Sequence, residues 1–350
     1  MEKISVLAIT KNGISIGQKL KELFSKWEIF GPEKFANEDS SITWYSEPTS
    51  EKIVELFKNN DGLICLFSLG AVIRLIAPHL KDKKTDPAVI VIDDKTNFVI
   101  SVLSGHIGGA NELTQEIAEK LQAQAVITTA ADVNKTIAVD LVGRNFGWKI
   151  DDDSVVTRIS AHMVNGEPIG VLQEVGNKEW YKELPKNVTL YSTMEELVKS
   201  KSKANLIISD KIIEEQISTE SVIYRPPSLV IGIGLHWDTS KEMILEGIES
   251  CLKKFKLSSK SIAKLVSIKK PKDVQGLIDA GKEISVPVQY IEREELAGIT
   301  APNPSETVKA FEGTASVSEA AAILVSNGKL IVEKQKFPPN LTIAIARIKN

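Results

Sequence analysis

Short apolar runs alternate with amphipathic stretches along the first third of the chain. The runs Ile4–Ile9, Gly62–Phe67 and Ala88–Asp93 have the length and the β-branched content of buried strands. Gly17–Phe24 and Gly70–Ile76 instead carry apolar residues at helical spacing. Strands that alternate with helices predict an α/β fold with a mostly parallel sheet.

A change of strand direction is expected further along. Phe98–Leu103 is a further strand, and only the short turn Asp94–Asn97 separates it from the strand before, which predicts a hairpin. Asn111–Leu121 follows as an amphipathic helix, and Ala125–Thr129 as another strand.

The pattern loosens between about residues 137 and 224, and a new α/β pattern begins afterwards. Arg225-Pro226-Pro227-Ser228 is predicted to be a linker, because consecutive prolines stop helices and resist central strands. We therefore expect an N-terminal α/β domain over residues 1–137, a smaller middle module over 138–225 and a separate α/β domain over 229–350.

Two capping boxes predict helix starts in the last domain. Thr239 is followed three residues later by Glu242, and Ser316 by Glu319. Gly328 stands where a glycine often ends a helix. The expected strands of this domain are Leu229–Ile233, Leu330–Val332 and Leu341–Ala346.

Composition is that of a globular protein of 350 residues with a formal net charge of −3. No basic stripe predicts nucleic-acid binding, no apolar run is long enough to cross a membrane, and the start does not resemble a secretory signal. Cys65 and Cys251 are predicted to be two reduced thiols in a cytoplasmic protein.

A glycine-rich turn, SGHIGGANEL at Ser104–Leu113, joins a strand to a helix. Gly105, Gly108 and Gly109 let the backbone approach a ligand, and the following helix start favours an anion. His106 within this turn is a candidate acid–base group. Alternatively, the glycines only turn the chain, Asn111 caps the helix and His106 bonds a carbonyl.

A basic cluster follows an earlier strand, in the segment SLGAVIRLIAPHLKDKKTDP. Arg74 and Lys83 are candidates to bind carboxylates at the carboxyl ends of the strands. The alternative is a solvated loop, which is favoured for Lys81 and Lys84. Asp86 is either a turn former or part of the site.

Two threonines and an aspartate end another strand, in ITTAAD. Thr128, Thr129 and Asp132 are candidates to orient a ligand or a water, or they cap the following turn.

Two other site types find little support. The pair Gly232 and Gly234 lacks the third glycine of a dinucleotide fingerprint, because Trp237 stands in its place. The four histidines are scattered, without the spacing of metal ligands, so no protein-held metal is expected.

These stretches together resemble the cobalamin biosynthesis protein G family of cobalt-precorrin-5A hydrolases. The resemblance rests on GAVIRLIAP, KTDPAVIVID, ISVLSGHIGGANELTQEIA and VITTAAD, and then on VIGIG, LVSIKK, PSETVKAFEGTASVSEAAAIL and TIAIA. The middle region matches loosely, and Leu235, His236, Trp237 and Asp238 depart from the family pattern after Gly234.

The resemblance implies hydrolysis of the δ-lactone of cobalt-precorrin-5A, which gives cobalt-precorrin-5B and acetaldehyde. Cobalt would arrive within the substrate, so no other cofactor is expected. His106 and Asp132 are our candidate proton-transfer residues, and backbone amides near Gly108 and Gly109 our candidate oxyanion site. The candidate substrate-binding residues are Arg74, Lys83, Asp86, Ser104, Gly105, Gly108, Gly109, Asn111, Thr128 and Thr129.

Two other functions stay open from the residues alone. A non-catalytic carrier or scaffold would bind the corrinoid and release no acetaldehyde. A nucleotide- or phosphate-binding protein would use the glycine-rich helix start. A homodimer is the assembly that we expect.

Overall fold

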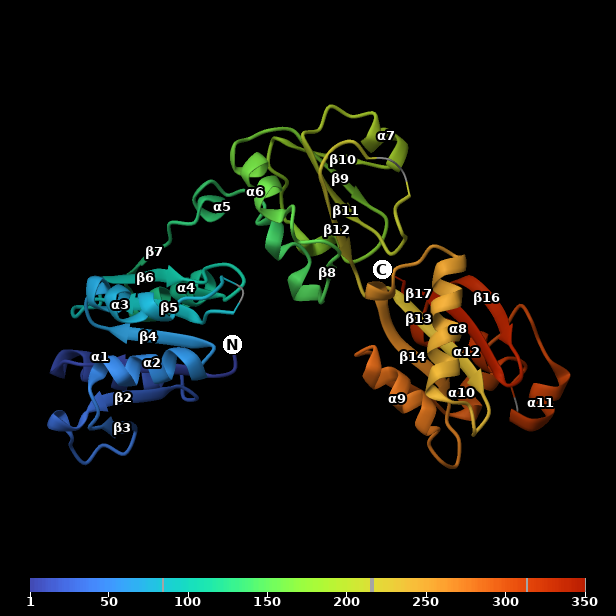
Figure 1. Cartoon of the computed structure of the whole chain (residues 1–350), viewed down its shortest axis with the longest axis horizontal. Coiled ribbons are helices and arrows are strands. Elements are labelled where there is room, and N and C mark those ends of the chain that lie inside the picture. The colour runs from blue at the N-terminus through green and yellow to red at the C-terminus, as the bar shows by residue number, and fades with distance from the viewer. Residues whose placement is uncertain (84, 215–216, 313, 350) are drawn as a thin grey trace. The chain divides into compact units, whose positions relative to one another are not determined.

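The structure is a computed structural model that describes residues 1–83, 85–214, 217–312 and 314–349. The described residues form three separate β-sheets, each with its own helices (Figure 1). The chain divides into two compact units, Met1–Leu141 and Val142–Asn350. The second unit contains the middle and the C-terminal sheets. The predicted α/β class, with a mostly parallel N-terminal sheet and a separate C-terminal sheet, is confirmed.

The sheet of the first unit has the strand order β3-β2-β1-β4-β5-β6-β7. Its strands are β1 (Ile4–Ala8), β2 (Glu28–Pro32), β3 (Ile42–Tyr45), β4 (Gly62–Leu66), β5 (Ala88–Ile92), β6 (Phe98–Leu103) and β7 (Gln124–Val126). Its helices are α1 (Lys11–Leu23), α2 (Thr49–Asn59), α3 (Leu69–Ile76), α4 (Ala110–Leu121) and α5 (Ala130–Val133), with 3₁₀ helices at Glu33–Phe35, Ala77–His79 and Val139–Leu141.

Both faces of this sheet are covered by helices. Ile14 and Leu20 of α1, with Ile117 of α4, pack on one face. Ile53 of α2 and Val72 of α3 pack on the other. The central strands β1, β4 and β5 are therefore buried on both sides, which explains why they read as continuous apolar runs and not as alternating ones.

Strand direction reverses once across the sheet. Strands β1 to β5 are parallel, β6 pairs antiparallel with β5, and β7 pairs parallel with β6. The hairpin predicted at Asp94–Asn97 is confirmed, because β5 and β6 pair antiparallel on either side of the turn. The Phe98 amide donates a hydrogen bond to the Asp93 carboxylate across it. The segments after β6 and β7 consequently leave the sheet at the same edge, opposite to the carboxyl ends of β4 and β5.

The middle sheet has the order β10-β9-β11-β12-β8, parallel except at β8. Its strands are β8 (Lys149–Ile150), β9 (Ile169–Gln173), β10 (Val188–Tyr191), β11 (Ala204–Ile208) and β12 (Ser221–Arg225). Its helices are α6 (Val156–Val164) and α7 (Met194–Val198), with 3₁₀ helices at Arg144–Phe146 and Lys178–Trp180.

The C-terminal sheet has the order β15-β14-β13-β17-β16, in which β16 and β17 are antiparallel to their neighbours. Its strands are β13 (Leu229–Leu235), β14 (Ile262–Ile268), β15 (Val288–Ile291), β16 (Lys329–Phe337) and β17 (Leu341–Arg347). Its helices are α8 (Lys241–Lys254), α9 (Gln275–Glu283), α10 (Arg293–Ala297), α11 (Glu306–Glu312) and α12 (Val317–Ser326), with a 3₁₀ helix at Ser259–Ser261.

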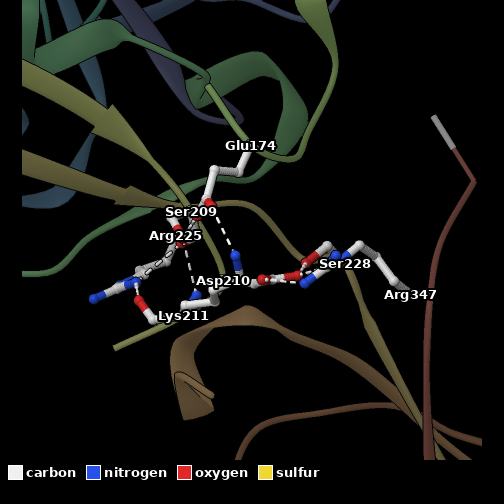
Figure 2. A network of polar contacts seen from close by, with 7 residues as sticks. All are labelled: Glu174, Ser209, Asp210, Lys211, Arg225, Ser228 and Arg347. Carbon is white, nitrogen blue, oxygen red and sulfur yellow. Dashed lines mark hydrogen bonds and ion pairs between the residues drawn. The ribbon is translucent and has the colours of Figure 1, made fainter. Parts of the chain in front are cut away.

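A buried ion pair joins the middle and C-terminal sheets within the second unit (Figure 2). Asp210, which follows β11, is fully buried and accepts hydrogen bonds from Arg347 Nε at 2.7 Å and Nη2 at 2.8 Å. The Ser228 hydroxyl donates to the same carboxylate at 2.9 Å. Nearby, Arg225 donates to the carbonyls of Ser209 and Lys211 and to Asp151 at 2.8 Å.

Local predictions in the second unit need corrections. Arg225 belongs to β12 and is buried, and Ser228 is buried as well, so neither residue belongs to an exposed linker. Helix α8 is capped by Ser240 and not by Thr239, whose hydroxyl accepts the His236 amide.

Helix α12 begins after Ser316 as expected, but its capping contacts and its end differ from the expectation. Ser316 is its N-cap residue, as predicted, but makes no side-chain capping bond. The Glu319 carboxylate accepts from Asn303 and from the Lys334 amide and so does not complete the capping box. The left-handed C-cap is Asn327. Gly328 is required by packing, since a Cβ there would lie 1.9 Å from the Arg347 carbonyl oxygen.

Candidate functional site

The glycine-rich turn follows β6 and leads into α4. Gly109 has a φ of 80°, in the left-handed region that glycine tolerates. Gly105 and Gly108 are needed for space instead. A Cβ at Gly105 would lie 2.6 Å from Asn111 Oδ1, and one at Gly108 would lie 2.4 Å from the Ser104 Cβ. The glycines thus let the turn fold closely over the start of α4.

The backbone amides of this turn mostly bond to carbonyls within it. The Gly109 amide donates to the His106 carbonyl, Ala110 to Ser104, and Asn111 to Gly105. The Gly109 amide is therefore engaged in this conformation, and the oxyanion site expected near Gly108 and Gly109 stays a prediction. The α4 N-terminus is also partly closed to an external anion for the same reason.

His106 lies between two carboxylates. Its Nε2 is 3.0 Å from Asp132 Oδ2, and its Nδ1 is 3.3 Å from Asp140 Oδ1. Asp132 comes from α5, after β7, and Asp140 comes from the 3₁₀ helix Val139–Leu141. The two predicted proton-transfer residues are thus in direct contact, although 26 positions separate them in the sequence.

The two carboxylates change the protonation of the ring. The hydrogen bond with Asp140 is the largest influence and raises the pKa of His106, although partial burial acts in the opposite direction. Asp132 adds to the rise. Burial alone would raise the pKa of Asp140, but the bond to His106 and its charge outweigh this effect and lower it. Lys83 contributes to that lowering through its charge.

Asn111 organises the other side of Asp132. Its side chain is buried, donates to Asp132 Oδ2 at 2.8 Å and to the Thr129 hydroxyl at 2.9 Å, and accepts from Ser101 at 2.6 Å. Asn111 therefore does not cap α4, whose N-cap residue is Gly109. Thr129 precedes α5 but makes no capping bond with its side chain.

A pocket opens beside these residues, with a volume of about 490 Å³. Its polar lining comes from Gly105, His106, Gly109, Asn111, Glu112, Gln115 and Asp132, and its apolar lining from Ala125, Ile127, Val133 and Leu141. Small-molecule pockets typically measure about 300–1,000 Å³. The pocket is thus large enough for an organic group with one polar and one apolar side.

The other predicted binding residues do not line this pocket. Ser104 donates to the Asp86 carbonyl at 2.8 Å, and the Asp86 carboxylate accepts the Lys81 amide, so this pair shapes the loop before β5. Arg74 is exposed on α3, and Thr128 is exposed after β7. Lys83 is close enough to influence Asp140, and Lys84 lies outside the described residues.

Sequence reasoning missed Asp140, which lies 34 positions after His106 and beyond the domain boundary predicted at residue 137. No spacing signal connects the two residues, because the contact depends on how the chain returns after α5. Glu112 and Gln115 were also missed, although their spacing on α4 places them on one helix face.

Two features bear on cofactors and membranes. Among the described residues, no three or more His, Cys, Asp or Glu side chains are placed to hold a metal ion. In the same part of the chain, no helix has the length and apolar character to cross a membrane.

Gly232 serves packing, since a Cβ there would lie 1.8 Å from the Ser318 carbonyl oxygen.

Comparisons with known proteins match nearly the whole chain. Three family profiles match in order: Cobalamin synthesis G N-terminal over residues 51–132, Cobalamin biosynthesis central region over 137–226, and Cobalamin synthesis G C-terminus over 229–346. A protein of Priestia megaterium described as cobalt-precorrin-5A hydrolase is 42% identical, with 98% of this chain and 94% of the relative covered.

More distant relatives carry similar descriptions. A cobalt-precorrin-5A hydrolase of Salmonella typhimurium is 27% identical, with 95% of this chain and 94% of the relative covered. A crystal structure of a cobalamin biosynthesis protein G homolog from Sulfolobus solfataricus is 23% identical, with a TM-score of 0.39 and 99% and 98% coverage of the two chains. From the match over nearly its full length, this chain belongs to the cobalamin biosynthesis protein G family.

Proposed function

We propose that this protein is a hydrolase of cobalamin biosynthesis that opens the δ-lactone of cobalt-precorrin-5A and yields cobalt-precorrin-5B and acetaldehyde. The observation that carries the proposal is a pocket containing a histidine–carboxylate pair, His106 and Asp132, in a chain 42% identical to a cobalt-precorrin-5A hydrolase. The pair gives the protein a proton-transfer group, which a carrier does not need.

The size of the pocket indicates which part of the substrate enters it. About 490 Å³ is space for a lactone ring and its surroundings, not for a whole corrinoid with its carboxylate arms. The apolar side chains Ile127, Val133 and Leu141 would contact the hydrocarbon edge of the macrocycle. Asn111 and Asp132 would face the polar atoms of the lactone.

The chemistry requires two proton movements. Water attacks the lactone carbonyl carbon and loses a proton, and the ring oxygen takes up a proton as the acyl C–O bond breaks, so that it leaves as a hydroxyl. That hydroxyl then loses its proton while the adjacent C–C bond breaks, so that acetaldehyde departs and the bonding electrons remain on the macrocycle, which takes up a proton. The Asp132 and His106 pair is positioned to accept and return such protons.

Direct assay separates this proposal from the carrier alternative. The purified protein is incubated with cobalt-precorrin-5A, and acetaldehyde is measured with an NADH-linked dehydrogenase. We expect one acetaldehyde for each corrinoid converted, over many turnovers. Tight corrinoid binding, seen as an optical shift without acetaldehyde, would support the carrier or scaffold function instead.

A further inference from the structure

Asp140 contacts His106 but does not line the pocket. Its Oδ1 lies 3.3 Å from His106 Nδ1, on the opposite side of the ring from Asp132. His106 and Asp132 line the pocket, whereas Asp140 is not among the lining residues. The Asp132 side chain is 44% exposed, but those of His106 and Asp140 are only 17% and 18% exposed. The three residues thus form a row in which Asp132 is the most exposed member.

The two oxygens of Asp132 have different surroundings. Oδ2 receives both the His106 contact at 3.0 Å and the Asn111 hydrogen bond at 2.8 Å. Oδ1 has no hydrogen-bond partner among the described residues. One oxygen is therefore held in place while the other is available to a water or substrate in the pocket.

A ring between two carboxylates has a defined proton arrangement. Each ring nitrogen can satisfy its carboxylate only by donating a proton, so the doubly protonated ring fits this geometry best. If Asp140 were neutral or absent, Nδ1 would lose its acceptor and the ring could turn or change tautomer. Other charged groups near the ring are Lys83, before β5, and Glu112, on α4.

We propose that Asp140 is a positioning residue that acts through His106 on Asp132. It holds the imidazole with Nε2–H directed at Asp132 Oδ2, so that Asp132 Oδ1 faces the pocket as the proton-accepting atom. The catalytic part of this inference rests on the proposed hydrolase function. The part concerning the ring's protonation does not, because it depends only on the contacts of His106.

The substitution Asp140→Asn tests this role because it keeps the shape of the side chain and removes its charge. With the acceptor charge lost, we expect the pKa of His106 to fall in the variant relative to wild type. We also expect kcat for acetaldehyde release to fall by about 10²-fold or more, within the range of general acid–base effects. KM should change little, since Asp140 does not line the pocket.

Two further variants make the test specific. Asp140→Glu keeps the charge, and we expect it to recover part of both the raised pKa and the activity. Asp94→Asn is the matched control. Asp94 accepts hydrogen bonds from Thr10 and Asn12 near the carboxyl ends of β1 and β5, at the other edge of the sheet. This control should leave both measurements unchanged.

The two measurements distinguish the inference from the proposed function. NMR titration of the histidine ring protons, assigned with a His106→Gln variant, reports the pKa without any substrate. If wild type releases no acetaldehyde but Asp140→Asn lowers this pKa, the positioning role stands and the hydrolase function fails. The positioning role is wrong if Asp140→Asn leaves the pKa of His106 and the pH profile of kcat as in wild type. It is also wrong if Asp140→Glu recovers no more of the pKa and the activity than Asp140→Asn does.

Discussion

At the scale of single residues, the site depends on how His106 holds its charge. Both neighbouring carboxylates favour the protonated ring, and the pKa of His106 is raised in the folded protein. The unfolded chain lacks these neighbours, so its histidine titrates near the ordinary value of about 6.5. Protonation is therefore coupled to the stability of the first unit.

This coupling gives a pH-dependent prediction. A raised folded pKa means that the contribution of His106 is fully present below about pH 6.5 and is lost as the pH rises through the folded pKa. The lowered pKa of Asp140 keeps that carboxylate ionised throughout this window. We expect His106→Gln to lower the melting temperature more at pH 5.5 than at pH 9. An equal loss at both pH values would show that the ring is not held by charge.

The sequence allowed part of this site to be predicted, and the reason differs between residues. Short local motifs indicated His106, Asn111 and Asp132, because each lies at the end of a strand or the start of a helix. Their mutual contacts follow from β6 and β7 being parallel neighbours. Asp140 could not be found, because its approach depends on the path of an irregular segment that has no periodic pattern.

At the scale of elements, buried charge links the strands of the second unit. Asp210 follows β11, and its partner Arg347 ends β17. The pair therefore fixes the middle sheet to the C-terminal sheet at one point (Figure 2). Removing one member of a buried pair leaves the other charge without compensation.

We expect Asp210→Asn to lower the free energy of unfolding of this unit by about 3 kcal/mol, at the low end for broken buried pairs. The low end applies because the Arg347 side chain is 31% exposed and can recover some hydration. Urea unfolding followed by tryptophan fluorescence measures the change. Glu214→Gln is the control, since its ion pair with Lys256 is exposed and should contribute little. Equal stability of Asp210→Asn and the control would contradict a structural role for the pair.

Elements were predicted better than their ends. The apolar runs indicated β1, β4 and β5 correctly, because strands buried on both faces have continuous apolar sequences. The partly exposed strand β6 was also indicated by its apolar run. The strands β2 and β3 were missed, since Gly31 and Pro32 interrupt the first and the second is only four residues long. Helix caps depend on single side-chain contacts, and Ser240 in place of Thr239 shows how one position decides them.

At the scale of the whole molecule, the match with a member of the family covers 98% of the chain. The family profiles cover segments of all three sheets, and the pocket lies entirely within the unit Met1–Leu141. The domain boundaries predicted at residues 137 and 225 remain predictions. A corrinoid exceeds this pocket, so its carboxylate arms must extend beyond the pocket residues.

The central claim is that Asp132 in this pocket performs proton transfer during lactone opening. The most direct test compares wild type with Asp132→Asn for two quantities, corrinoid binding by optical titration and acetaldehyde release in single turnover. The variant should bind cobalt-precorrin-5A with an affinity within a few-fold of wild type. It should release acetaldehyde at a rate that is lower by about 10²-fold or more. Release at the wild-type rate, with binding intact, would contradict the claim.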